Sequence, residues 1–231
     1  LYFSGRITLT LNRFMTKQTP IILDSTRWFE IAAIFLTAIG KFIFMDGLNY
    51  RLFFETFAIL FWIGYIVYRA KKQPGILYYW GFRTDNFKVV LKKVLPFGLL
   101  ALVFFFVVGS WQGTLNLTWH IIPILITYPI WGTIQQFLII GLFTGNLQHQ
   151  TKIKLSNTLN IAITTVLFAA VHFPDKWLML GTFFLAIIYS KLYLKERNLY
   201  VLGILHGWLG ALFYYTIVNR DPFLEVFGKY L

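Results

Sequence analysis

The sequence predicts an all-α membrane protein, a helical bundle of seven, or at most eight, transmembrane helices. Of its 231 residues, 58% are hydrophobic and 20% aromatic, whereas only 13% are charged. The apolar residues form long blocks, not the alternation of an amphipathic surface. Because a helix needs about 20 residues to cross a hydrocarbon core of ~30 Å, each block is long enough for one crossing.

Seven crossings use nearly the whole chain and leave no room for a soluble domain. The fourth block is long enough for a helix plus a re-entrant piece, which would give the eighth element. The predicted spans are 28–45, 52–68, 93–109, 119–145, 156–172, 177–194 and 199–219.

The basic residues predict the orientation, because Lys and Arg in short loops remain on the cytoplasmic side. With the N-terminus inside, sixteen of them fall in inner segments. The outer segments hold four, Arg51, Lys176, Arg220 and Lys229, and Lys41 lies within the first span. We therefore expect an integral protein of a bacterial inner (cytoplasmic) membrane, with a cytoplasmic N-terminus and the C-terminus outside.

The net charge of +12 is spread over the ends of the hydrophobic blocks. This distribution favours membrane lipids with anionic head groups as partners over nucleic acid, which would need one basic soluble face. The absence of cysteine excludes a disulfide framework, thiolate metal ligands and a cysteine nucleophile.

Three regions are expected along the chain. Residues 1–5, LYFSG, read as the remnant of a cleavable tag. Residues 6–92 form an N-terminal segment with two transmembrane helices and an interfacial connector, in which Tyr78-Tyr79-Trp80 suits the membrane surface. Residues 93–231 form the core bundle. Asp24-Ser-Thr is the expected N-cap of the first span.

Polar side chains interrupt three of the apolar blocks: Gln135 and Gln136, His172, and His206. An unpaired polar group in hydrocarbon costs several kcal/mol, so these residues predict a shared buried polar site. Adjacent residues of a helix point about 100° apart. Only one glutamine can therefore face a given cavity, and the other is expected to brace a neighbouring helix.

Each intrusion also has a plain structural interpretation. The glutamines can act as hydrogen-bonding glue between helices, worth about a kcal/mol. His172 stands at a helix end beside Pro174, where an interfacial histidine is common. His206 lies about seven residues inside its span, on a face of small residues formed by Gly203, Gly207 and Gly210.

The remaining polar residues of the spans are expected to be structural. His120 and His149 fall in or beside loops and should be solvated. Glu30, Lys41 and Glu55 should pair with polar groups of other helices, or Lys41 should extend to the interface.

Prolines predict a break in the helix just before the glutamines. Pro123, Pro129 and Gly132 interrupt the fourth span. A proline there frees backbone carbonyls, and such breaks commonly line a cavity.

These motifs resemble the CPBP family of intramembrane endopeptidases, which includes CAAX prenyl proteases, bacteriocin-processing enzymes and Abi-like proteins. That family carries Glu-Glu-x-x-x-Arg, then Phe-x-x-x-His, then His-x-x-x-Asn or Asp. Phe168-Ala-Ala-Val-His172 fits the second motif, and His206 keeps the histidine of the third. The resemblance covers most of residues 75–219, including a Gly-Phe-Arg entry at 81–83.

The departures from the family concern its chemistry. Gln135-Gln136 stands in place of the two glutamates, Ile140 in place of the arginine, and Gly210 in place of the asparagine or aspartate. Either the chain is a divergent natural member or the glutamates were changed to inactivate it. The two further departures favour natural divergence.

In the family, one glutamate is thought to activate water for attack on a peptide carbonyl, with the help of the histidines. A glutamine amide has no basic site near neutral pH, so ordinary proteolysis should fail here.

Three hypotheses for the function stay open at this point. The first is a CAAX-protease-like intramembrane endopeptidase, or a divergent hydrolase or transferase, acting on membrane-embedded or lipidated peptides. The resemblance implies that Gln135 or Gln136 orients water or substrate, and that His172 and His206 polarise a carbonyl or form a weak divalent metal site. The second is a pseudoprotease: a non-catalytic scaffold, immunity or substrate-binding protein. The third, haem ligation by both histidines, would be tested by an absorption spectrum.

The predicted spans place the two histidines at different depths. His172 would lie about 25 Å along an outward helix that starts near residue 156, whereas His206 would lie only about 10 Å into its own. A shared site therefore requires that the fifth helix starts deeper, tilts strongly, or has other boundaries.

Overall fold

The computed structural model describes residues 20–150, 154–229 and 231. The expected tag remnant at 1–5 and residues 6–19 of the N-terminal segment lie outside them. The described chain is all-α, and six of its helices are long and apolar enough to span a membrane. These helices are Asp24–Gly47, Arg51–Lys72, Phe87–Gln112, Ile121–Gln148, Lys176–Glu196 and Leu199–Val218. They confirm the prediction of a membrane protein built of helices.

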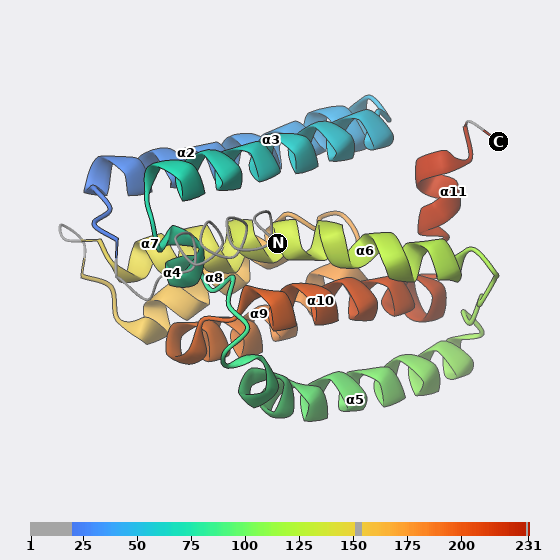
Figure 1. Cartoon of the computed structure of the whole chain (residues 1–231). Helices are drawn as coiled ribbons and strands as arrows, with labels where there is room; N and C mark the ends of the chain where they lie inside the picture. Colours follow the sequence, from blue (N-terminus) through green and yellow to red (C-terminus); the bar gives the residue numbers. More distant parts are fainter. Residues whose placement is uncertain (1–19, 151–153, 230) are drawn as a thin grey trace, which may run out of the picture.

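Figure 1 shows the long helices side by side, with α6 and α10 at the centre, the α2–α3 hairpin on one side and α5 on the other. Three of the long helices contain π-helical turns, designated η. The elements are α2 (Asp24–Gly40), η1 (Lys41–Gly47), α3 (Arg51–Lys72), α4 (Ile76–Trp80), α5 (Phe87–Gln112), α6 (Ile121–Gln136), η2 (Phe137–Thr144), α7 (Gly145–Gln148), α8 (Asn157–Ala170), α9 (Lys176–Glu196), α10 (Leu199–Phe213), η3 (Tyr214–Val218) and α11 (Pro222–Phe227).

The predicted span 156–172 differs from the other six. It forms α8, which has 14 residues, or about 21 Å of helix, and is too short to cross the hydrocarbon core. The Ser156 hydroxyl accepts a hydrogen bond from the Leu159 amide and caps the start of α8. The chain then leaves the helix after Ala170, before Pro174, and α9 begins at Lys176. The structure thus supports six spans of full length instead of seven.

Side-chain caps mark the start of the later helices. The carboxylate of Asp175 accepts from the Leu178 amide, and Asn198 accepts from the Val201 amide. The predicted cap at Asp24 is wrong, because Leu23 occupies the cap position and makes no side-chain cap bond. Asp24 is instead the first helical residue, where its negative charge interacts favourably with the helix dipole.

Glycines bring the central helices α6 and α10 into backbone contact. A Cβ atom on Gly207 would lie 2.6 Å from the Cα of Pro129, and one on Gly132 would lie 2.7 Å from the backbone N of Gly207. Gly203 approaches Thr133 in the same way. The predicted small-residue face is therefore confirmed at Gly203 and Gly207, and it fixes the register of α6 on α10.

The predicted break in the fourth span is not found, because α6 continues through Pro129 to Gln136, but the predicted released carbonyl is present. Proline has no N–H, so the Leu125 carbonyl four residues earlier lacks its usual helical donor. The indole Nε1 of Trp208 on α10 donates to this oxygen across 3.0 Å. A side chain of the neighbouring helix thus satisfies the carbonyl that the proline releases.

The connector between α3 and α5 is more buried than the sequence indicated. Trp80 of α4 is buried and its ring centroid lies 5.0 Å from that of Phe137. Gly81 has a φ of 96°, and a Cβ there would meet the Arg197 carbonyl oxygen at 2.8 Å. The Leu199 amide donates to the Gly81 carbonyl at 2.8 Å. The Gly-Phe-Arg entry therefore anchors the turn between α9 and α10, and Trp80 is a core residue and not a surface one.

A buried ion pair joins α2 to α3, and Asn146 of α7 connects this pair to the rest of the bundle. Arg69 Nη1 lies 2.5 Å from Glu30 Oε1, and the Asn146 amide of α7 donates to the other Glu30 oxygen at 2.6 Å. The Tyr65 hydroxyl also donates to Glu30. The structural role predicted for Glu30 is confirmed, whereas Lys41 pairs with Asp46 at 2.5 Å.

Candidate functional site

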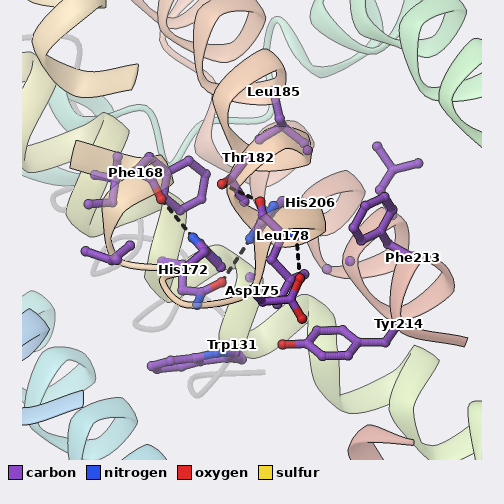
Figure 2. Close-up of a pocket in the computed structure, with 18 of the residues that line it drawn as sticks. Trp131, Phe168, His172, Asp175, Leu178, Thr182, Leu185, His206, Phe213 and Tyr214 are labelled. Carbon is purple, nitrogen blue, oxygen red and sulfur yellow. Dashed lines mark hydrogen bonds between the residues drawn. The ribbon is translucent and has the colours of Figure 1, made fainter. Parts of the chain in front are cut away.

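A large cavity lies between the hairpin α2–α3, α5 and the central helices. Its volume is about 690 Å³, and its walls are mostly apolar. Gln135, His172 and His206 all line it, together with Phe168 (Figure 2). Residues of three separate segments thus line one cavity.

His206 and Gln135 form the centre of this site. Nε2 of His206 lies 2.9 Å from Oε1 of Gln135, and the histidine is only 8% exposed. An amide oxygen can only accept, so Nε2 of His206 carries the proton in this arrangement. Its Nδ1 atom is buried and has no hydrogen-bond partner among the described residues. His206 therefore holds a free basic nitrogen inside the bundle.

His172 is held in the complementary tautomer. Its Nδ1 atom lies 2.7 Å from the Phe168 carbonyl oxygen, so Nδ1 donates and Nε2 is left with the lone pair. The Phe168 ring contacts both histidines, with centroid distances of 5.1 Å to His172 and 5.5 Å to His206. Both histidines are thus arranged around one aromatic side chain.

The expected conflict in depth between the histidines is not found in the structure, because both rings contact Phe168 and both line one cavity. The helix ends at Ala170, and the His172 amide donates to the Ala169 carbonyl in a tight turn. The His172 ring lies against the preceding helical turn, where its Nδ1 atom contacts the Phe168 carbonyl four residues earlier. Hydropathy alone placed this boundary too far along the chain.

Gln136 occupies a different environment from Gln135. It is 0% exposed and is not among the residues that line the cavity. Neither atom of its amide has a hydrogen-bond partner in the described part of the chain. This arrangement agrees with the prediction that only one glutamine faces the cavity. The hydrogen bond expected from Gln136 to a neighbouring helix is not found among the described residues.

The two other positions at which the chain departs from the family motifs also differ from each other. Ile140 is fully buried in the hydrophobic core. Gly210 lines the cavity, and a Cβ atom there would meet nothing within 4 Å. The wall beside Gly210 therefore has room for a larger side chain.

The donors of the site do not fit a hydrolytic metal centre. Such a centre uses three strong protein ligands and an open position. Within the described ranges no group of three or more His, Cys, Asp or Glu side chains is placed to hold an ion. His172 and His206 offer two imidazoles, and Gln135 adds only an amide oxygen, so we derive no step through a metal. The weak divalent site and the haem ligation stay predictions.

Two other histidines are less solvated than the sequence indicated. His120 Nδ1 lies 2.6 Å from Asp221 Oδ2, and its ring stacks on Phe223. Burial raises the pKa of Asp221, but hydrogen bonds from His120 and Tyr215 lower it by more, so the pKa lies below its ordinary value. His149 contacts the Gly145 carbonyl and Arg197. Both histidines therefore make contacts that hold neighbouring segments together, His120 with Asp221 and His149 with Arg197.

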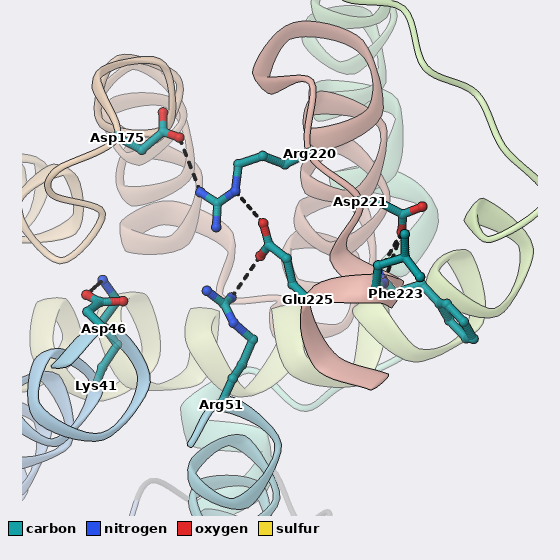
Figure 3. Close-up of polar contacts among 9 residues, drawn as sticks. Lys41, Asp46, Arg51, Asp175, Arg220, Asp221, Phe223 and Glu225 are labelled. Atoms are coloured by element: carbon teal, nitrogen blue, oxygen red, sulfur yellow. Dashed lines mark hydrogen bonds and ion pairs between the residues drawn. The ribbon is translucent and has the colours of Figure 1, made fainter. Parts of the chain in front are cut away.

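Sequence reasoning missed a chain of charged residues (Figure 3), of which Arg51, Asp175 and Arg220 line the cavity. Glu225 of α11 lies between Arg220 and Arg51, with 3.4 Å between its Oε2 atom and Nη1 of Arg51. Arg220 also lies 3.4 Å from Asp175. Asp175 follows His172 by three residues and was visible in the sequence. The contact between α3 and α11 left no local signal.

The fold and the histidine–glutamine pair define an integral membrane protein with a polar site inside its helical bundle. Residues 114–212 match the family model described as type II CAAX prenyl endopeptidase Rce1-like. The matched segment contains Gln135, His172 and His206. The Gly-Phe-Arg entry lies before the matched segment. Comparison with curated proteins and with solved structures gave no significant match.

Proposed function

We propose that the cavity binds a membrane-embedded or lipidated peptide, in a site of the CAAX endopeptidase type that lacks the base for ordinary proteolysis. The observation that carries the proposal is the contact of 2.9 Å between Gln135 and His206 inside an apolar cavity of about 690 Å³. The cavity has the size and lining of an apolar ligand site. Its amide and imidazoles supply the few polar groups that would orient a peptide bond.

The missing base follows from the chemistry of Gln135. In the resembling family a glutamate takes the proton from water, and an amide cannot do so near neutral pH. Asp175 is the nearest carboxylate in sequence to His172, but it caps α9 and pairs with Arg220. The residues that line the site are thus suited to binding a peptide but lack the base needed to hydrolyse it.

The distribution of charge supports a cytoplasmic start of α2. Among the described residues, the end of the bundle that contains the start of α2, α4 and the turn between α9 and α10 has twelve Lys and Arg and four Asp and Glu. The opposite end has five of each. Because basic loops remain on the cytoplasmic side, the basic end is the cytoplasmic one in our proposal.

A peptide with a photoreactive group on its lipid chain tests the binding. Gly210→Trp fills the cavity from a position with open space beside it, and should reduce crosslinking at least about tenfold by occupying the ligand's volume. Gly64→Trp is the matched control, because Gly64 is exposed on α3 and also has nothing within 4 Å. Equal crosslinking of both variants and the wild type would contradict the proposal.

Slow hydrolysis by the histidines is the second candidate function. Nε2 of His172 and Nδ1 of His206 are the unprotonated nitrogens in these tautomers, and a neutral imidazole can accept a proton from water. Under this candidate His206→Ala abolishes cleavage while peptide crosslinking continues. Cells in which a His172→Ala, His206→Ala double variant functions fully would exclude it.

A further inference from the structure

Glu55 is an acidic residue of the cavity wall that has no direct ion-pair partner among the described residues and interacts with Arg51 only through space. It lies one helical turn after Arg51 on α3, is partly buried and lines the cavity. Its carboxylate makes no hydrogen bond or ion pair with any residue that the structure describes. The other acidic side chains of the wall do: Asp46 pairs with Lys41, and Asp175 pairs with Arg220. An ionisable residue inside a membrane span marks a functional site by default.

Two tyrosines line the same cavity as this carboxylate. Tyr128 of α6 and Tyr214 of η3 both line the cavity, and their ring centroids are 6.3 Å apart. Their hydroxyl groups make no hydrogen bond within the described residues. Figure 2 shows the hydroxyl end of Tyr214 directed into the pocket that contains the histidines. Aromatic faces attract cations, and Arg220 already lies 5.4 Å from the Tyr214 ring centroid.

Three carboxylates, those of Glu55, Asp175 and Glu225, and two guanidinium groups gather at this end of the cavity. The guanidinium groups of Arg51 and Arg220 are both engaged by Glu225, and Arg220 also by Asp175. Glu55 is the third carboxylate beside these two cations, and nothing described neutralises it by direct contact. A ligand with a negative group would therefore meet repulsion here, whereas a positive group would complete the pairing.

We propose that this end of the cavity is a binding site for an alkylammonium group. Glu55 supplies the counter-charge, and the rings of Tyr128 and Tyr214 supply cation–π contacts. The apolar stem of the ligand lies along the remaining cavity wall, as the stem of a lysine does on an apolar surface. The site is separate from the Gln135–His206 pair, and its occupation does not depend on catalysis.

Three probes with the same apolar stem test the assignment: dodecylammonium, dodecanol and dodecanoate. The full-length protein is reconstituted in phosphatidylcholine nanodiscs, and binding is followed by the fluorescence of tryptophan, because Trp131 and Trp177 line the cavity. The wild type should bind dodecylammonium about tenfold more tightly than dodecanol, because only the ammonium group gains the carboxylate and cation–π contacts. Dodecanoate should bind most weakly. Equal affinities of the three probes would overturn the proposal.

A pair of variants assigns the preference to Glu55. Glu55→Gln should bring the affinities for dodecylammonium and dodecanol to within about twofold, since the counter-charge is lost. Asp46→Asn is the matched control, because Asp46 lines the same wall but already pairs with Lys41, and it should keep the preference. Partition of each probe into the bilayer is the same for every variant. Persistence of the ammonium preference in Glu55→Gln contradicts the proposal, as does its loss in Asp46→Asn.

Two competitors identify the source of the ammonium group. A hydrophobic peptide with a single lysine that displaces dodecylammonium assigns the site to a peptide side chain. Displacement when phosphatidylethanolamine replaces part of the phosphatidylcholine assigns it to a lipid head group. If neither competes, the alkylammonium assignment is wrong. If Glu55→Gln does not fold, the three probes are compared on the wild type and on Tyr128→Leu. This variant should weaken the binding of dodecylammonium alone, and an unchanged affinity would contradict the proposal.

Discussion

Gln135 and His206 form a side-chain contact of 2.9 Å, between Oε1 and Nε2, across the two central helices of the bundle. The contact lies one turn beyond Gly132, where α6 and α10 touch through their backbones. The close glycine packing sets the register, and the register places the amide against the imidazole. A polar pair inside an apolar bundle is thus a consequence of which small residues face each other.

The two adjacent glutamines should respond oppositely to replacement by leucine. Gln135→Leu removes the partner of His206 and leaves a buried imidazole unpaired, which should lower the free energy of unfolding by about 1–3 kcal/mol. Gln136→Leu removes a buried amide that has no partner, so it should leave stability unchanged or raise it by a similar amount. Thermal unfolding in one detergent measures both. Equal destabilisation would mean that Gln136 has a partner.

Two glycines of α10 provide a matched test of the helix contact. Gly207→Ala places a methyl group 2.6 Å from the backbone of Pro129, so the helices must separate, at a cost of about 1–3 kcal/mol. Gly210→Ala meets open space and should be neutral or stabilising by about 0.5–1 kcal/mol, because alanine favours the helix. Chemical or thermal unfolding distinguishes the two. A tolerated Gly207→Ala would show that the backbones do not touch.

The buried ion pair of Glu30 and Arg69 should be essential to the hairpin α2–α3. Arg69→Met leaves the Glu30 carboxylate buried without its cation and should cost about 3–5 kcal/mol. The control is Arg83→Gln, which breaks an exposed pair with Asp85 and should cost less than about 1 kcal/mol. Limited proteolysis between α3 and α5 reports release of the hairpin. Similar protection of both variants would contradict the structural role of Glu30.

Much of the site could be predicted from the sequence, because its signals are local. A polar side chain in an apolar run must find a partner, and this reasoning grouped Gln135, His172 and His206 before any geometry was known. The proline at position 129 likewise predicted a released carbonyl, which Trp208 satisfies. Burial cost and backbone chemistry act at the residue itself, so they can be read from the residue.

The rest depended on contacts between distant segments. Hydropathy could not show that α8 stops at Ala170, since the apolar run continues beyond the helix. Trp80 looked like an interfacial residue, but it fills the core beside Phe137. The pairing of Arg51 with Glu225 joins residues 174 positions apart and leaves no pattern in either segment. Such features follow from packing, which a single sequence does not display.

The central claim is tested most directly by a cleavage assay. The substrate is a fluorogenic lipidated peptide analogue with one lipid chain, and it is offered to the purified wild type and to its glutamate variants. Gln135→Glu places a base in the cavity beside His206 and should release the peptide's C-terminal fragment, whereas Gln136→Glu alone should not, because that side chain does not line the cavity. Adding His206→Ala to Gln135→Glu should abolish the gain. The wild type should bind the peptide and leave it intact. Wild-type cleavage that His206→Ala abolishes would contradict the claim that the site lacks its base.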